Sequence, residues 1–464
     1  MQQVTNRTFD EIGVGASHTV VRTLTATDVE ALALAAGDVE SFHLDLTPGA
    51  VAEPAMAPGA AAVALVAGVL NRRLPGPGSA IVGTHFRYAG KVRAGDTLTV
   101  VVTATAKHAA GQRIDFQCTC TNGEGELLVD GVATVSAPSV RIAYTNIATP
   151  EVVLRRNDAL ARLLQRCEGL APVTCAVVHP CDYESLAGAI ESAKRGLIVP
   201  ILIGPEAKIR AVAESANIDI TPYRLIGTPH SHAAADHAVS LARAGEVEAL
   251  MKGILHTDEL MEAVVPSATG LRTERRISHV FVMDVPAYPR TLMITDAAIN
   301  IAPDLACKAD ICQNAIDLAH VLGNPLPKVA ILSAAETVNP KIESTLHAAA
   351  LCKMADRGQI TGGILDGPLA FDNAVSPDAA RTKGIVSPVA GVADILLVPD
   401  LESGNMIAKQ LTYLAGADGA GIVVGTRVPI VLTSRADNVR TRLASTAVLK
   451  LVAHDRRTKL LPRE

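Results

Sequence analysis

A series of short apolar runs, separated by helical patterns, constrains the fold of residues 151–464. The runs are Thr174–Val178, Ile198–Ile203, Glu248–Met251, Val280–Val285, Thr291–Thr295, Val329–Ser333, Gly363–Leu365, Ile395–Val398 and Ile430–Ser434. Apolar runs of this length predict buried strands, and helices between them predict a largely parallel sheet covered on both faces. Ligands of such sheets bind beyond the carboxyl ends of the strands. We therefore expect the functional side chains directly after these runs.

The first 138 residues show a different pattern. Gly59–Leu70 is almost wholly apolar and predicts a buried helix. The strand patterns that follow it are Ala80–Tyr88, Asp96–Ala106, Ile114–Thr121 and Leu127–Ser136. Together they predict an α+β domain in which an antiparallel sheet wraps one helix. Residues 139–150 lack a helical period and predict a linker, so we expect domains at 1–138 and 151–464.

Composition and charge restrict the classes of function. The net charge of −5 and the aromatic content of 3% provide neither the basic surface nor the stacking side chains of a nucleic-acid-binding protein. The apolar runs are too short to span a bilayer, and the first thirty residues lack the apolar core of a signal peptide. Eight scattered cysteines suit a reducing compartment. We expect a cytoplasmic protein that binds neither nucleic acid nor membrane.

Polar residues do follow the predicted strands. They are the run Thr295–Asn300, Ser333, Asp366 with Gly367, Pro399 with Asp400, and Ser434 with Arg435. A phosphate group needs backbone N–H donors, hydroxyls and a cation around it, and Arg435 could bind it with two hydrogen bonds. A Ser-Arg pair alone is more often a helix cap and a surface ion pair. It is the convergence of several such positions that favours a phosphate site.

Several motifs in a fixed order connect this half to a known family. The motifs are Met251-Lys252-Gly253 with Thr257, Thr295 to Pro303, Asp366 to Ala374, Ser387 to Asn405 with Lys409, and Val428 to Asp437. Over roughly residues 150 to 464 the chain resembles the phosphate acetyl/butyryltransferases. The resemblance implies a bilobed α/β domain that reversibly exchanges CoA and phosphate on a short acyl group, with no metal in the chemistry. The sequence Gly-Pro-Leu-Ala-Phe-Asp-Asn at residues 367–373 is more similar to the butyryl branch of the family than to the acetyl branch.

The resemblance also assigns roles to residues. Ser434 would sit at the reacting centre, and Arg435 would bind phosphate or the acyl oxygen. Expected substrate-binding residues are Lys252, Thr257, Asn300, Ser333, Asp366, Asn405 and Lys409. Acetyl-branch members are expected to carry an aspartate seven residues beyond the serine as a base for the CoA thiol, but Thr441 stands here. Thiol activation is therefore unassigned, and Asp366 could equally cap a turn.

The N-terminal part has a resemblance of its own. The run Gly37 to His43, the run Pro75 to Gly78, Phe86 and the run Gly95 to Leu98 resemble MaoC-type hydratases of the hotdog fold over about residues 8 to 137. Asp38 and His43 would then be the catalytic pair that activates water for addition to a 2-enoyl thioester.

Three positions depart from the hydratase pattern. Glu40 and Ser41 replace the usual Asn-Pro, and Pro54 stands before the predicted helix where backbone N–H donors are needed. The alternative is therefore a degenerate hotdog domain kept for dimerisation.

These inferences combine into a bifunctional enzyme that acts on CoA thioesters. The substrates expected are acyl-CoA, enoyl-CoA and phosphate, with no tightly bound cofactor and no metal. The sequence has neither a phosphate-cradling Gly-x-x-x-x-Gly-Lys-Ser/Thr nor an extended dinucleotide fingerprint, which argues against ATP and NAD. Both resemblances imply a homo-oligomer. The competing hypothesis is a regulatory protein in which a silent fold senses acyl-CoA.

Overall fold

The computed structural model describes residues 3–37, 57, 60–145, 159–434 and 437–460. The chain divides into two compact units, Met1–Arg155 and Arg156–Glu464. Each unit has its own hydrophobic core.

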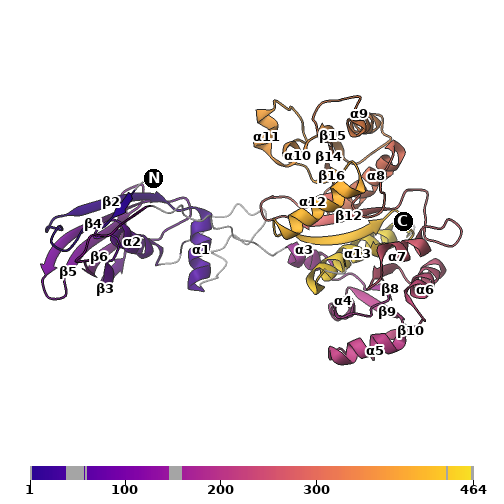
Figure 1. Cartoon of the computed structure of the whole chain (residues 1–464), viewed down its shortest axis with the longest axis horizontal. Helices are drawn as coiled ribbons and strands as arrows, with labels where there is room; N and C mark the ends of the chain where they lie inside the picture. Colours follow the sequence, from indigo (N-terminus) through magenta and orange to yellow (C-terminus); the bar gives the residue numbers. More distant parts are fainter. Residues whose placement is uncertain (1–2, 38–56, 58–59, 146–158, 435–436, 461–464) are drawn as a thin grey trace. The chain divides into compact units, whose positions relative to one another are not determined.

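The N-terminal unit is an antiparallel sheet packed on one helix (Figure 1). Its elements are β1 (Gln3–Thr5), β2 (Ser17–Thr23), α1 (Ala26–Ala36), α2 (Ala61–Arg72), β3 (Ala80–Tyr88), β4 (Thr97–His108), β5 (Arg113–Thr121), β6 (Leu127–Ser136) and β7 (Ala143–Thr145). Five strands form the main sheet, in the order β2-β4-β5-β6-β3. Alternate side chains of β4 and β5, such as Val100 and Phe116, are buried in one core with Val66 of α2. The predicted hotdog fold is confirmed.

Part of the predicted linker is a strand. β7 lies within residues 139–150 and pairs antiparallel with β1 at the other end of the unit. Val4 of β1 is buried, and the Asn6 amide donates to Val140 O at 2.9 Å. Residues 143–145 therefore belong to the N-terminal unit.

The C-terminal unit alternates strands and helices. Its strands are β8 (Val173–Val178), β9 (Ile198–Gly204), β10 (Arg224–Gly227), β11 (Ala249–Lys252), β12 (Ser278–Asp284), β13 (Leu292–Thr295), β14 (Lys328–Leu332), β15 (Ile364–Leu369), β16 (Ile395–Leu397), β17 (Asp418–Val424) and β18 (Ile430–Val431). Its helices are α3 (Ala159–Arg166), α4 (Tyr183–Lys194), α5 (Glu206–Ser215), α6 (Ser231–Ala244), α7 (Thr257–Val264), α8 (Leu305–Val321), α9 (Glu343–Asp356), α10 (Phe371–Val375), α11 (Pro377–Thr382), α12 (Leu401–Tyr413) and α13 (Val439–Leu460).

All these strands join one eleven-stranded sheet. The order is β10-β9-β8-β11-β18-β17-β12-β13-β16-β14-β15. The first five strands run parallel, and so do the last four. Between them β17 and β12 pair antiparallel with each other and with their outer neighbours. The two parallel groups therefore point in opposite directions, which gives the expected two-lobed, largely parallel α/β architecture.

Alternation along the strands assigns the helices to two faces. Cys175 and Val177 of β8 pack with α4 and α5 in a core that also contains α8, α9 and α13, whereas Ala176 and Val178 pack with α6. In the other lobe α12 packs on Ile294 of β13, whose neighbour Met293 belongs to the first core. We call the two sides the α13 face and the α12 face; the latter also carries α6 and α7.

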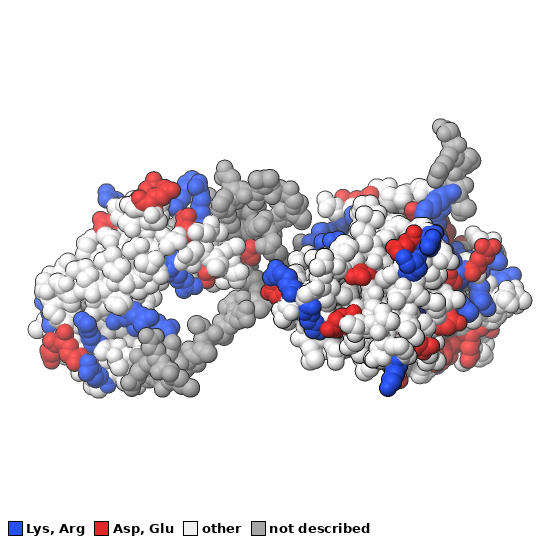
Figure 2. All heavy atoms as spheres, turned by 90° about the horizontal axis from the view of Figure 1, so that it is seen from above, with Lys and Arg blue, Asp and Glu red and all other residues white. Residues whose placement is uncertain are grey.

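The surface of the C-terminal unit carries both signs of charge. On the face seen in Figure 2, basic and acidic side chains are interspersed over this unit. Within the described ranges, no helix combines the length and apolar character needed to cross a membrane.

Candidate functional site

Three consecutive backbone carbonyls just beyond β18 are held by side chains from three different elements. We call the segment that contains them, residues 432–438, the Ser434 loop; its residues 435 and 436 lie outside the described part. His279 Nε2 of β12 lies 3.4 Å from Leu432 O, and Lys252 Nζ of β11 donates to Thr433 O at 3.3 Å. The Arg442 guanidinium of α13 donates to Ser434 O at 3.2 Å. Two backbone bonds add to these contacts, from the Leu432 N–H to Gly421 O and from the Asp437 N–H to Ser434 O, each at 3.2 Å. Side chains from three elements thus help to set the position of Ser434.

The buried side chain of Arg442 supports the Ser434 loop. It is 1% exposed, and besides Ser434 O it donates to Asp437 O at 3.3 Å and to Lys252 O at 3.4 Å. Gly188 of α4 makes room for it, since a Cβ there would lie 2.8 Å from Arg442 Cδ. One buried cation thus connects the carboxyl end of β11 with the loop after β18.

Lys252 and Thr257 stand at the carboxyl end of β11, as predicted. Lys252 is 3% exposed, and Thr257 is half-buried at the first position of α7. The chain between them turns at Gly253, where a Cβ would lie 2.5 Å from both Val178 O and His179 O. A glycine is therefore required for β11 to end beside β8.

Asp437 brings charges from both lobes together. Its Oδ2 accepts the Ser434 N–H at 2.7 Å. Burial raises the pKa of the Asp437 carboxyl above its usual range, while the Ser434 N–H and the cations Arg442, Lys252 and Lys409 oppose that shift. Lys252 belongs to one lobe and Lys409, on α12, to the other, so the Ser434 loop lies where the lobes meet on the α12 face.

α12 carries two of the predicted binding residues. Asp400 caps it by accepting the Ser403 N–H at 2.8 Å. Asn405 donates to Ala297 O at 3.1 Å, and Lys409 is exposed one turn later. Gly404 permits this contact, because a Cβ there would lie 2.7 Å from Asp296 O. The helix is thereby fixed against the segment after β13.

Asn300 stabilises the same segment after β13. Its amide donates to Ile277 O at 2.8 Å and to Asp296 Oδ2 at 2.5 Å. Asp296 is 2% exposed and also accepts the N–H groups of Ala298, Ile299 and Asn300, and burial raises its pKa. The structure gives Asn300 a structural contact, and its role toward substrate stays a prediction.

Ser333 and Asp366 lie farther out, at strands β14 and β15. Ser333 Oγ is 2.9 Å from Ser344 Oγ of α9, and Asp366 Oδ1 accepts the N–H of Gly367 at 2.9 Å. α9 belongs to the α13 face, so the Ser333 contact lies on that side of the sheet, away from the Ser434 loop. Three further predicted residues, Asp38, His43 and Arg435, lie outside the described residues.

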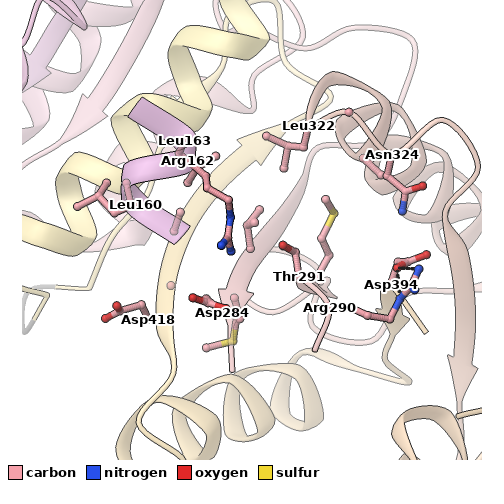
Figure 3. Close-up of a pocket in the computed structure, with 18 of the residues that line it drawn as sticks. Leu160, Arg162, Leu163, Asp284, Arg290, Thr291, Leu322, Asn324, Asp394 and Asp418 are labelled. Atoms are coloured by element: carbon pink, nitrogen blue, oxygen red, sulfur yellow. Dashed lines mark hydrogen bonds and ion pairs between the residues drawn. The ribbon is translucent and has the colours of Figure 1, made fainter. Parts of the chain in front are cut away.

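Thr441 lies on the other side of the sheet. Its N–H donates to Asn438 Oδ1 at 2.9 Å, which caps α13. With Arg440 it lines a cavity of about 480 Å³ among α3, α8, α13 and the central strands. Figure 3 shows Arg162 reaching from α3 toward Asp284 in this cavity. It also shows Arg290 beside Asp394, and the Arg290 guanidinium lies 2.6 Å from Asp394 Oδ1. Thr441 therefore bonds to the last residue of the Ser434 loop through its backbone N–H, and it lines the cavity on the α13 face.

The buried histidine under the loop makes stability depend on pH. His279 is fully buried, and burial lowers its pKa from 6.5 to about 4. The unfolded chain gains the proton first as pH falls, so stability that is present above pH 6.5 is lost toward pH 4. We expect unfolding free energy to fall by about 2 kcal/mol between pH 7 and pH 5 from this group. Thermal unfolding of wild type and His279→Gln at both pH values measures it; an equal loss in both proteins would contradict it.

Within the described residues no group of three or more His, Cys, Asp and Glu side chains is arranged to hold a metal ion. The Ser434 loop carries the Ser434 hydroxyl and the Asp437 carboxyl, and Lys252 and Lys409 of neighbouring elements lie near it, which suits an anionic organic substrate.

Comparison with known proteins decides the family. Residues 229–449 match the family model described as phosphate acetyl/butaryl transferase. The phosphate acetyltransferase of Rhizobium meliloti is 65% identical over 296 residues, which is 64% of this chain and 94% of the relative. The chain belongs to this family.

Other members agree with this placement. The phosphate butyryltransferase of Clostridium acetobutylicum is 42% identical over 60% of this chain and 92% of its own length. A branched-chain phosphotransacylase from Enterococcus faecalis superposes with a TM-score of 0.53 at 32% identity, over 60% of this chain and 99% of its own. The C-terminal unit is thus a phosphate acyltransferase, as its motifs predicted.

Two residues that bond to Ser434, Asp437 and Arg442, are not among the site residues predicted from the sequence, where Asp437 is only the end of a motif. The burial of Arg442 has no local signal in the sequence, because Arg440 and Thr441 precede it in the first turn of α13, and the space that Gly188 of α4 leaves for it appears only in the structure.

Proposed function

We propose that the C-terminal unit transfers a short acyl group, acetyl or butyryl, between CoA and phosphate at the Ser434 loop. The observation that carries this proposal is the meeting of Ser434, Asp437, Lys252 and Lys409 on the α12 face. Lys409 is exposed and would bind phosphate groups of the substrates, while the buried Lys252 adds positive charge behind the loop. Arg435 would add a bidentate phosphate contact, with Thr257, Asn300 and Asn405 as further binding residues. The binding roles of Ser333 and Asp366, which lie at β14 and β15 away from this loop, stay predictions.

The test is phosphate-dependent release of free CoA thiol from acetyl-CoA and butyryl-CoA by the full chain. Wild type is expected to release thiol from at least one of them, and Ser434→Ala and Arg435→Ala to lose at least a hundredfold in kcat/KM, as for removal of transition-state contacts. The ratio of the two wild-type rates gives the preferred acyl group. A wild type that binds CoA without releasing thiol would favour the acyl-CoA sensor instead.

We infer a second activity for the N-terminal unit, hydration of a short 2-enoyl-CoA to the 3-hydroxyacyl-CoA. Its support is the hotdog architecture together with the spacing of Asp38 and His43. Loss of the crotonyl-CoA absorbance on addition of the full chain, abolished in Asp38→Asn and in His43→Gln, is the expected result. A rate equal to that of buffer would favour a hotdog domain kept for dimerisation.

We further propose that the chain works as a homo-oligomer, the state that both resemblances imply. Light scattering of the purified full chain should give a mass that is a multiple of 48.2 kDa. A monomer at micromolar concentration would overturn this proposal.

A further inference from the structure

Formation of a thioester from CoA and an acyl phosphate requires a group that accepts the thiol proton. An ordinary thiol has a pKa near ~8.5, so only a few per cent is thiolate at neutral pH. A positioned base typically contributes about 10²–10⁴-fold to such a step. Thr441, at the position where a base was expected, lies on the α13 face and lines another cavity.

Several charged or titratable groups lie against the Ser434 loop. Arg442 and the two lysines Lys252 and Lys409 are cations, and His279 is fully buried beneath Leu432. None of these four is suited to accept a proton from a substrate that approaches the exposed Ser434. Among the described residues of the loop, the titratable group is the carboxyl of Asp437, which is half-buried and accepts the Ser434 N–H at 2.7 Å. Two further carboxylates, Asp182 and Glu184 of the α4 region, act on Arg442, and Asp182 caps α4 by accepting the Ser185 N–H.

We propose that Asp437 is the base that takes the proton of the CoA thiol. This inference rests on the proposed phosphate acyltransferase function of the same loop. Three observations support it: the carboxyl is bonded to the N–H of the proposed reacting serine, it lies near the exposed Lys409 that would draw in anionic substrates, and Arg442 anchors its backbone oxygen. The Ser434 N–H bond fixes one carboxyl oxygen and so orients the group.

The step balances in protons and electrons. The thiol proton passes to an Asp437 oxygen while sulfur bonds to the acyl carbon. The bond between that carbon and the phosphate oxygen then breaks, and its electron pair leaves with phosphate. Phosphate takes the proton from Asp437, which regenerates the carboxylate and gives acyl-CoA and hydrogen phosphate. The reverse direction uses the same groups in reverse order.

This role sets the sign of the pH dependence. The carboxylate is the active form, so kcat falls as pH falls through the pKa of Asp437. Burial raises that pKa, against Lys252, Lys409, Arg442 and the Ser434 N–H, so the fall begins above the ordinary carboxyl range of about 4.

The Asp437→Asn variant distinguishes a catalytic base from a residue whose role is to cap the loop. The asparagine side-chain oxygen still accepts the Ser434 N–H, but the amide cannot take a proton. In the full chain, with acetyl phosphate or butyryl phosphate and CoA, we expect kcat to fall about 10²–10⁴-fold with the KM for each substrate nearly unchanged. Asp418→Asn, a carboxyl that bonds Arg440 at 3.2 Å on the cavity side, is the matched control and should keep wild-type kcat.

A chemical-rescue experiment gives a second test, which stays valid if the amide of Asp437→Asn disturbs the contacts of the buried Arg442. Asp437→Ala leaves space for a small carboxylate, so added formate should restore activity in proportion to its concentration. Rescue together with the low kcat of Asp437→Asn establishes the base. An Asp437→Asn enzyme with wild-type kcat, or an Asp437→Ala enzyme that formate does not rescue, overturns it. A wild type without transferase activity would instead refute the underlying function.

Discussion

Arg442→Ala is expected to destabilise the C-terminal unit by about 3–5 kcal/mol and to reduce transferase activity at least tenfold. The substitution removes a buried cation and leaves the carbonyls of Lys252, Ser434 and Asp437 without this donor. It also leaves the Asp437 carboxyl without one of its neighbouring positive charges. Breaking buried contacts of this kind typically costs about 3–5 kcal/mol. In calorimetry, the midpoint temperature for unfolding of this unit should be roughly 10 °C lower than in wild type.

Arg440→Ala provides the matched control for Arg442. Arg440 lies two residues earlier, and its side chain is 38% exposed and paired with Asp418 at 3.2 Å. Exposed pairs contribute about 0–1 kcal/mol, so this variant should unfold near the wild-type temperature. Equal midpoints for Arg442→Ala and wild type would refute the bracing role. Arg442→Lys keeps the charge without the fork of donors and should fall between the two.

Gly253→Ala is expected to have the second large effect, about 3 kcal/mol or more. The added methyl group would lie 2.5 Å from two backbone oxygens, Val178 O and His179 O, neither of which can rotate away. Relief requires the ends of β8 and β11 to separate, and overpacking of this kind costs about 1–3 kcal/mol, occasionally more. Lys252 is the preceding residue, so we also expect weaker CoA binding in isothermal titration.

Gly227→Ala is the control for that substitution. Gly227 ends β10, and the nearest atom to an added Cβ is Glu206 Oε2 at 3.7 Å, an ordinary contact. This variant should lie within about 0.5 kcal/mol of wild type. If Gly253→Ala unfolds at the same denaturant concentration as Gly227→Ala, the close approach of β8 and β11 does not require a glycine at residue 253.

Much of the fold follows from local pattern. The runs Ile198–Ile203 and Val329–Ser333 became β9 and β14 within one residue at each end, because a buried strand must be apolar on both faces. β17 was missed since it begins Asp418-Gly419-Ala420-Gly421, which looks like a loop in sequence. Gly421 is needed there because a Cβ would lie 2.5 Å from Leu432 O. That requirement comes from a residue distant in sequence and is invisible to a local pattern.

The site was predictable to the extent that strand ends converge. Lys252 and Ser434 lie near each other, as strand-end residues should, because β11 and β18 are parallel neighbours. Ser333 follows a strand as well, but β14 belongs to the group that runs the opposite way, so its end lies elsewhere. The direction reversal depends on the antiparallel pair β12 and β17, which no single segment encodes.

The three carbonyls beyond β18 have a consequence for how this enzyme can change over evolution. Leu432 O, Thr433 O and Ser434 O are held by His279, Lys252 and Arg442, and each of these side chains belongs to a different element. A loop fastened by a strand ladder alone could move only if the sheet moved. Here a conservative change at one anchor, such as Arg442→Lys, would shift the serine while the sheet keeps its register. Acyl preference could therefore drift in small steps between related chains that share an unchanged scaffold.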